Sequence, residues 1–402
     1  MSSDLDSSDL DLICVVPDQI HLFIFYGEND TTLYSMLRKE LIDAKLSWIA
    51  GKVPLIRIEF GQIEVDLLLV PLPIKYLTGK AAASKLESDQ VIKDIRNEKG
   101  IYSLAGYRSS KFQLSLVNDK QLFAYFLKSI KVWAKNRLIY SGIFGYFNGA
   151  TLAVMVTKIC ALFPFAPLAY LLYQFFQIYS KWNWPVDPVL LDKLSKDSLN
   201  VLVNGWPPKF GESLMTVITP KFPEQNAAFN VNKFTLRTIV EEINIANQIL
   251  SGNAQKWAQI FEEVKYAKEF AHFAIILCAD VDAQRYATNC GFYRCKIRRN
   301  LFEWATETKV SPMLAHYQII PQSEEKTICN ISDFDANCTF WVVGLTMKNG
   351  CEKKLNELPP IYRNDSNSNE FLNSTQMSSS YTNAENLRNT LNELRATTAA
   401  AS

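Results

Sequence analysis

The first part of the chain alternates apolar and polar positions with the period of β-strands. An apolar run over residues 10–16 predicts a strand, and a helix is predicted over residues 31–46. Residues 56–60 alternate apolar and charged side chains, Gly61-Gln62 forms a turn, and residues 63–70 are apolar again. This pattern predicts a hairpin with one buried and one polar face.

From residue 119 to 250 the apolar period changes to that of helices, with one clear helix over residues 122–135. Residues 151–179 are apolar and long enough to span a bilayer. However, Lys158 interrupts the stretch, and the prolines of the Phe163–Pro167 segment break it. We therefore predict two buried helices joined by a proline turn, and no membrane span.

The last part mixes the two periods. Strands are predicted over residues 270–277 and 339–347, with a basic helix over 292–307 between them, which suits a small α+β sandwich. Because residues 231–265 contain no Gly/Pro/Ser-rich spacer, this unit should pack directly on the helical part. After Lys354 the chain is rich in Asn, Ser and Thr, and this tail is predicted to be disordered.

Composition narrows the class of protein. The chain has 402 residues, of which 48% are hydrophobic and 21% charged, so two or three soluble globular domains are expected. A net charge of +1 means that any nucleic-acid binding must come from local patches. The eight cysteines form no CxxC pair and the three histidines are widely separated, a pattern that argues against a Cys/His metal site. No signal-peptide pattern opens the sequence, and free thiols fit a reducing compartment.

Three aspartates are the candidate catalytic residues. Asp9 and Asp11 are two residues apart at the head of a strand and so project from one face. Asp66 lies inside an apolar strand, where an unpaired carboxylate is costly to bury. Converging carboxylates can hold two divalent cations that act on a phosphoryl or nucleotidyl transfer. Taken alone, Asp-x-Asp before an apolar run is more typical of a solvated loop than of a catalytic site.

A basic, aromatic segment is the candidate RNA-binding site. It contains Arg294, Lys296, Arg298 and Arg299, flanked by Phe292, Tyr293 and Trp304. Basic side chains can follow a phosphate backbone while aromatic rings stack on bases. The alternative is a solvated amphipathic helix with its aromatic side chains in the core, and the sequence leaves both open.

Several blocks, in order over residues 4–350, resemble the eukaryotic poly(A) polymerase family. The run Ser8–Pro17 looks like its Asp-x-Asp strand, and the segments 53–58 and 63–66 look like the strands that carry its third aspartate. Residues 129–135 with Tyr140 resemble its nucleotide-facing helix. Further similar blocks are Ser180–Pro185, Val217–Pro220, Ala315-His316 and Trp341–Leu345.

The resemblance implies an α+β multidomain enzyme that adds AMP from ATP to RNA 3′ ends in nuclear mRNA processing, alongside cleavage and polyadenylation proteins. It would comprise a DNA-polymerase-β-like nucleotidyltransferase palm (1–118, N-terminally incomplete), a helical middle domain (119–250), an RRM-like RNA-binding domain (251–352) and the tail (353–402). Asp9, Asp11 and Asp66 would hold two Mg²⁺ or Mn²⁺ ions. The nucleotide-binding residues would be Lys131 and Tyr140 at the phosphates, with Gly149, and Met215 and Thr219 near the adenine.

The sequence also departs from the family pattern. The Gly-Ser helix that precedes Asp-x-Asp in the family lies outside this sequence, and Ala105 and Gly142 stand where the family has Asn. The family's Gly-Gly turn is Asn148-Gly149 here. Two hypotheses therefore stand: an RNA adenylyltransferase, or a catalytically impaired relative that binds RNA or protein.

Overall fold

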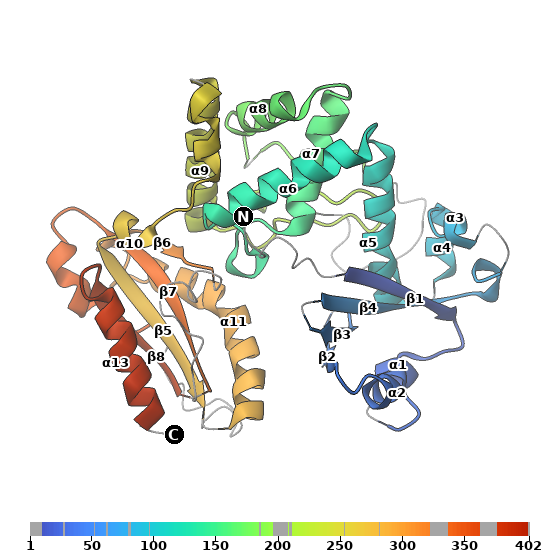
Figure 1. The fold of residues 1–402 in the computed structure, drawn as a ribbon, viewed down its shortest axis with the longest axis horizontal. Helices are drawn as coiled ribbons and strands as arrows, with labels where there is room; N and C mark the ends of the chain where they lie inside the picture. The colour runs from blue at the N-terminus through green and yellow to red at the C-terminus, as the bar shows by residue number, and fades with distance from the viewer. Residues whose placement is uncertain are drawn as a thin grey trace.

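The computed structural model describes residues 10–26, 29–51, 53–61, 63–78, 82–95, 97–184, 186–195, 208, 211–252, 254–280, 282–321, 337–361 and 376–400. A palm and a C-terminal domain lie on opposite sides of a helical middle domain, and the long helix α5 (Glu98–Ser115) leads from the palm into it (Figure 1). Asp9 lies outside the described residues.

The palm is built on a four-stranded sheet in the order β1-β4-β3-β2. The strands are β1 (Leu10–Pro17), β2 (Lys45–Ile49), β3 (Leu55–Phe60) and β4 (Ile63–Leu72). β1 and β4 are parallel, and β3 pairs antiparallel with both β4 and β2, which confirms the predicted hairpin. The short helices α1 (Leu22–Tyr26) and α2 (Leu33–Glu40) cover one face; α4 (Asp89–Asp94) and α5 cover the other, after the four-residue α3 (Ala82–Lys85).

The predicted helix over residues 31–46 was too long. The helix ends at Glu40, and Lys45–Ile49 is the edge strand β2, because pairing with β3 outweighs the helical spacing of the leucines.

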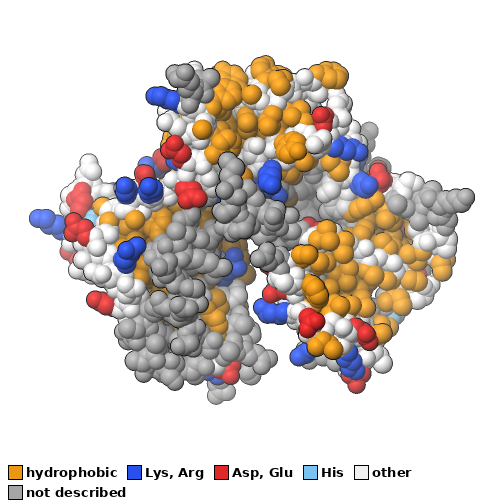
Figure 2. Space-filling view, viewed as in Figure 1, with side chains coloured by type: hydrophobic (Ala, Val, Ile, Leu, Met, Phe, Trp, Pro, Cys, Tyr) orange, Lys and Arg blue, Asp and Glu red, His pale blue; other side chains and the backbone are white. Residues whose placement is uncertain are grey.

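Hydrophobic side chains gather over the visible face of the palm (Figure 2). Leu10, Phe60 and Ile63 are each more than half exposed.

The middle domain is helical, as predicted. Its helices are α6 (Lys120–Asn136), α7 (Gly149–Leu162), α8 (Leu168–Tyr179) and α9 (Lys233–Ser251), with the 3₁₀ turn η2 (Gly142–Phe144) before α7. The proline turn over residues 163–167 separates α7 from α8, as the sequence indicated. Within the described part of the chain, no helix is long and apolar enough to cross a bilayer.

The C-terminal domain has an antiparallel sheet in the order β6-β7-β5-β8. Its elements are η4 (Ala254–Phe261), α10 (Tyr266–Glu269), β5 (His272–Asp280), α11 (Ala283–Thr306), β6 (Leu314–Ile319), β7 (Asn337–Met347), η6 (Glu352–Glu357), β8 (Gln376–Asn383) and α13 (Leu387–Ala400). If β5, β6, β7 and β8 are numbered 1 to 4 along the chain, the strand order is 2-3-1-4. The fourth strand lies beside the first, as expected for the split βαβ sheet of an RRM-like domain.

The prediction of a disordered tail was wrong for residues 376–400. β8 pairs with β5 from His272 to Ala279, and Leu387 and Leu391 of α13 are buried against the sheet. The tail has few large apolar residues, but Leu387 and Leu391 pack against β5 and bury apolar side chains of that strand. As a consequence, α11 covers one face of the sheet and α13 the other, so neither face is open for bases to stack on.

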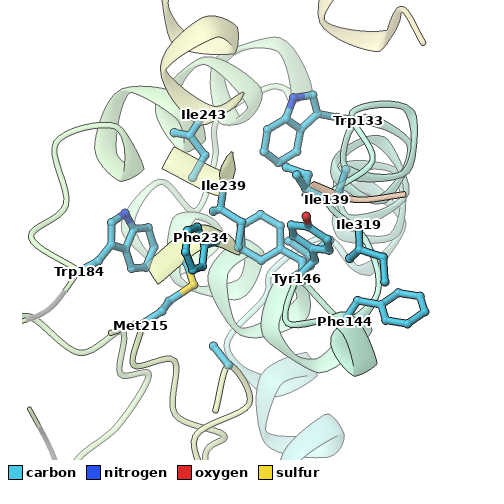
Figure 3. Packing of buried hydrophobic residues seen from close by; sticks show 14 of the residues in the cluster. Trp133, Ile139, Phe144, Tyr146, Trp184, Met215, Phe234, Ile239, Ile243 and Ile319 are labelled. Carbon is cyan, nitrogen blue, oxygen red and sulfur yellow. The ribbon is translucent and has the colours of Figure 1, made fainter. Parts of the chain in front are cut away.

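The middle and C-terminal domains share one hydrophobic core. It joins Trp133 and Ile239 of the middle domain to Ile319 of β6 (Figure 3), and it continues to Trp341 of β7 and Leu301 of α11. This confirms that the two domains pack directly on each other without a flexible spacer.

Candidate active site

Two of the three candidate aspartates lie side by side in the palm. The parallel register of β1 and β4 pairs Asp11 with Asp66. Residues that are paired on neighbouring strands project from the same face of the sheet. Asp11 and Asp66 therefore project from the face that α5 covers further along the strands. Asp66 is only 6% exposed. The donor chemistry of two adjacent carboxylates suits Mg²⁺ or Mn²⁺. Among the described residues, which do not include Asp9, no group of three or more His, Cys, Asp or Glu could hold a metal.

Asp66 already has a partner that the sequence analysis missed. Arg57 on β3 lies opposite Asp66, and its Nε and Nη2 donate to the two carboxylate oxygens at 2.8 Å each. Arg57 Nη1 also lies 3.9 Å from a carboxylate oxygen of Glu64. Such a bidentate pair is a strong charge-assisted contact that compensates the buried carboxylate. A cation at Asp66 would therefore have to compete with Arg57.

Three predicted nucleotide-binding residues meet at the start of α7. A side-chain carbon built on Gly149, the first residue of the helix, would lie 3.5 Å from the Tyr140 hydroxyl and 3.9 Å from Lys131 Nζ. Burial lowers the pKa of Lys131, and the charge of Lys135 lowers it further. Lys135 Nζ lies 5.8 Å from the centre of the Tyr140 ring. Lysine charges, a hydroxyl and a helix N-terminus make a site suited to an anion.

The other two residues predicted at the nucleotide are placed differently. Met215 is fully buried in the shared core, close to Trp184 and Phe234 (Figure 3). The Thr219 hydroxyl closes a local loop: it accepts from Gln225 N at 3.0 Å and donates to Gln225 O at 3.3 Å. Their segment approaches the anion site through its backbone, because Asn148 Nδ2 donates to Ala227 O at 2.9 Å.

The candidate RNA-binding residues do not form one surface. On α11, Arg294, Lys296 and Arg299 are exposed. Arg298 is half-buried against the middle domain, where its Nη1 donates to Asn230 O at 3.5 Å. Adjacent helix positions point about 100° apart, and of these two arginines only Arg299 is fully exposed, so RNA binding by Arg298 and Arg299 together stays a prediction. Lys296 Nζ lies 3.9 Å from the centre of the exposed Phe292 ring, and Arg299 pairs with Glu303 at 3.2 Å.

Paired aspartates on a mixed sheet, followed by a helical domain with a lysine–tyrosine anion site and a second antiparallel sheet, define the α+β fold of a nucleotidyltransferase. Sequence comparison narrows this class. Residues 122–263 match the family model described as the poly(A) polymerase central domain. The chain is therefore homologous to the poly(A) polymerases and carries the central domain of that family.

Two curated relatives extend the match beyond that domain. The poly(A) polymerase PAPalpha of Candida albicans is 30% identical over 301 residues, which are 73% of this chain and 52% of the relative. The nuclear poly(A) polymerase 2 of Arabidopsis thaliana is 27% identical over 303 residues, 73% of this chain and 36% of the relative. The chain thus spans about half or less of the length of these relatives. Among solved structures, the RNA terminal uridylyl transferase Cid1 is 15% identical with a TM-score of 0.40, over 64% of this chain and 81% of that one.

Proposed function

We propose that the chain is an RNA 3′-end adenylyltransferase, a poly(A) polymerase, that transfers AMP from ATP in mRNA 3′-end processing. The observation that carries the proposal is the convergence of Lys131, Tyr140 and Gly149 inside the poly(A) polymerase central domain. An ammonium group and a helix N-terminus are what a triphosphate needs. The register of Asp11 with Asp66 supplies neighbouring carboxylates on the palm.

In this proposal each residue has a defined task. Lys131 and the Tyr140 hydroxyl bind and orient the phosphates, and glycine at 149 lets a phosphate approach the helix backbone. Asp11 and Asp66, with Asp9, would hold Mg²⁺ or Mn²⁺, which when bound supplies positive charge to the attacking and leaving oxygens. The RNA 3′ end would enter beside the exposed Arg294, Lys296 and Arg299 of α11. One relative is named a nuclear enzyme, which supports a nuclear location and partners in cleavage and polyadenylation.

ATP binding tests this proposal directly. Lys131→Met should weaken ATP binding roughly thirty-fold, because a hydrogen bond from a charged donor contributes about 2 kcal/mol. Lys128→Met, which removes an exposed lysine from the same helix, is the matched control and should leave the affinity unchanged. Primer extension on oligo(A) with each of the four nucleoside triphosphates and Mn²⁺ would identify the nucleotide transferred. Equal ATP affinity in both variants would refute the site.

The second candidate is a catalytically impaired relative that binds RNA or protein. The Arg57–Asp66 pair favours this candidate, because Arg57 donates to both carboxylate oxygens of Asp66, which a metal ion would need as ligands. The departures at Ala105 and Gly142 point the same way. Retained ATP and RNA binding without primer extension, even in Mn²⁺, would favour this candidate over the enzyme.

A further inference from the structure

Gly142 and Asn148 lie on either side of the turn that leads into α7. The Asn148 side chain fills the space beside Gly142. A side-chain carbon built on Gly142 would lie 2.9 Å from Asn148 Cβ and 3.1 Å from Asn148 Nδ2. Both separations are shorter than van der Waals contact, so any side chain at 142 would displace Asn148. Two departures from the family pattern thus occupy one point of the structure.

The Asn148 amide makes three contacts from this space. Its oxygen accepts from Thr151 N at 2.8 Å and from Thr151 Oγ1 at 3.0 Å, which caps α7. Its nitrogen donates to Ala227 O at 2.9 Å, which ties the segment after Thr219 to the helix start. Asn230 Nδ2 adds a bond of 2.8 Å to Gly142 O and so holds the same segment to the turn.

Asn148 is also the direct neighbour of the anion site. The residue after it is Gly149, which faces the Tyr140 hydroxyl and Lys131 Nζ. Because the cap sets where the first turn of α7 begins, it sets the position of the Gly149 backbone relative to these two groups. A shift of the cap would move the helix N-terminus while Lys131, on α6, stays in place.

We propose that Asn148 is a positioning residue for the nucleotide site, and that glycine at 142 is the partner it requires. This rests on the proposed function of the Lys131–Tyr140–Gly149 site. Asn148 acts through the backbone of α7 and the segment around Ala227, and it needs no contact with ATP.

A double-mutant cycle tests the pairing. Gly142→Ala should lower the unfolding temperature in the unsubstituted protein, because the new methyl group meets Asn148. In the Asn148→Gly background the same substitution should have little further effect, since the space is then open. Gly142→Asn combined with Asn148→Gly should restore part of the stability that Asn148→Gly loses. Additive effects of the two single substitutions would overturn the pairing.

ATP titration tests the positioning role. Asn148→Gly should raise the ATP dissociation constant about tenfold, because the loss of one hydrogen bond that orients the site weakens binding by about this factor. Thr157→Val is the control: it removes a buried hydroxyl from α7, where Thr157 donates to Ala153 O at 2.7 Å, far along the helix from the cap. It should lower the unfolding temperature and leave ATP affinity unchanged.

The two parts of the experiment separate the possible failures. Unchanged ATP affinity in Asn148→Gly, with a stability loss like that of Thr157→Val, would reduce Asn148 to a structural cap and overturn the positioning role. Absence of ATP binding by the unsubstituted protein would instead refute the proposed function. The unfolding cycle would still decide whether positions 142 and 148 share one side-chain space.

Discussion

Replacing Arg57 by methionine should destabilise the palm and at the same time strengthen its binding of divalent cations. Arg57 holds both oxygens of a nearly buried carboxylate at 2.8 Å. Removing one partner of a fully buried pair costs about 3–5 kcal/mol. The Arg57 side chain is 30% exposed, so water takes over part of its role, and we expect a loss of about 2 kcal/mol. The freed oxygens of Asp66 then become available as ligands.

Two assays measure these effects. Urea unfolding without metal gives the loss of stability, and electron paramagnetic resonance of Mn²⁺ counts bound and free ions. We expect Mn²⁺ to bind roughly tenfold more tightly to Arg57→Met and to return part of the lost stability. Arg38→Met, which removes an exposed positive charge from α2 of the same domain, is the control for net charge.

A double variant makes the reasoning refutable. Arg57→Met with Asp66→Asn should recover much of the stability, because no buried charge is left without a partner, but it should not gain Mn²⁺ affinity. If Arg57→Met loses no stability, or if its Mn²⁺ affinity equals that of Arg38→Met, the pair does not control access to Asp66.

Three further outcomes are expected. Because burial lowers the pKa of Lys131, its ammonium is lost at a lower pH than that of an exposed lysine. ATP affinity should therefore fall as pH rises through a range below the ordinary lysine pKa, and Lys131→Arg, which keeps its charge, should abolish this fall. Leu391→Ala should cost about 2–4 kcal/mol in denaturant unfolding, against almost nothing for the exposed Arg388→Ala, unless α13 contributes no core. Arg299→Ala should weaken RNA binding and lower its salt dependence by about one ion, whereas Arg298→Ala should mainly lower the unfolding temperature; the reverse order would restore Arg298 to the RNA surface.

Local patterns predicted the elements whose structure depends on nearby residues. The hairpin of β3 and β4 follows from alternation around Gly61, and the break between α7 and α8 follows from proline. The position of Asp66 in an apolar strand indicated its burial as well. These features needed no information about distant parts of the chain.

Other features depend on contacts between distant segments. The Arg57–Asp66 pair requires the cross-strand register, and the inward turn of Arg298 requires knowledge of where α11 meets the middle domain. The strand β8 has a polar sequence, so propensity gave no sign of it. A signal existed in its partner: β5 is apolar on both faces almost throughout, and such a strand needs cover on each side and neighbours on both edges. The burial of Met215 had no comparable signal.

The shared core has a mechanical consequence. Since Trp133, Ile239 and Trp341 belong to one packed cluster, the middle and C-terminal domains should move as one rigid body. Any opening or closing motion must then bend the chain where this body meets the palm. At that joint Phe222 packs into the palm core, and the buried Arg108 of α5 donates to the Phe222 carbonyl. The carboxylates lie in the palm and the Lys131–Tyr140 site lies in the middle domain, so a movement at this joint would change the distance between them.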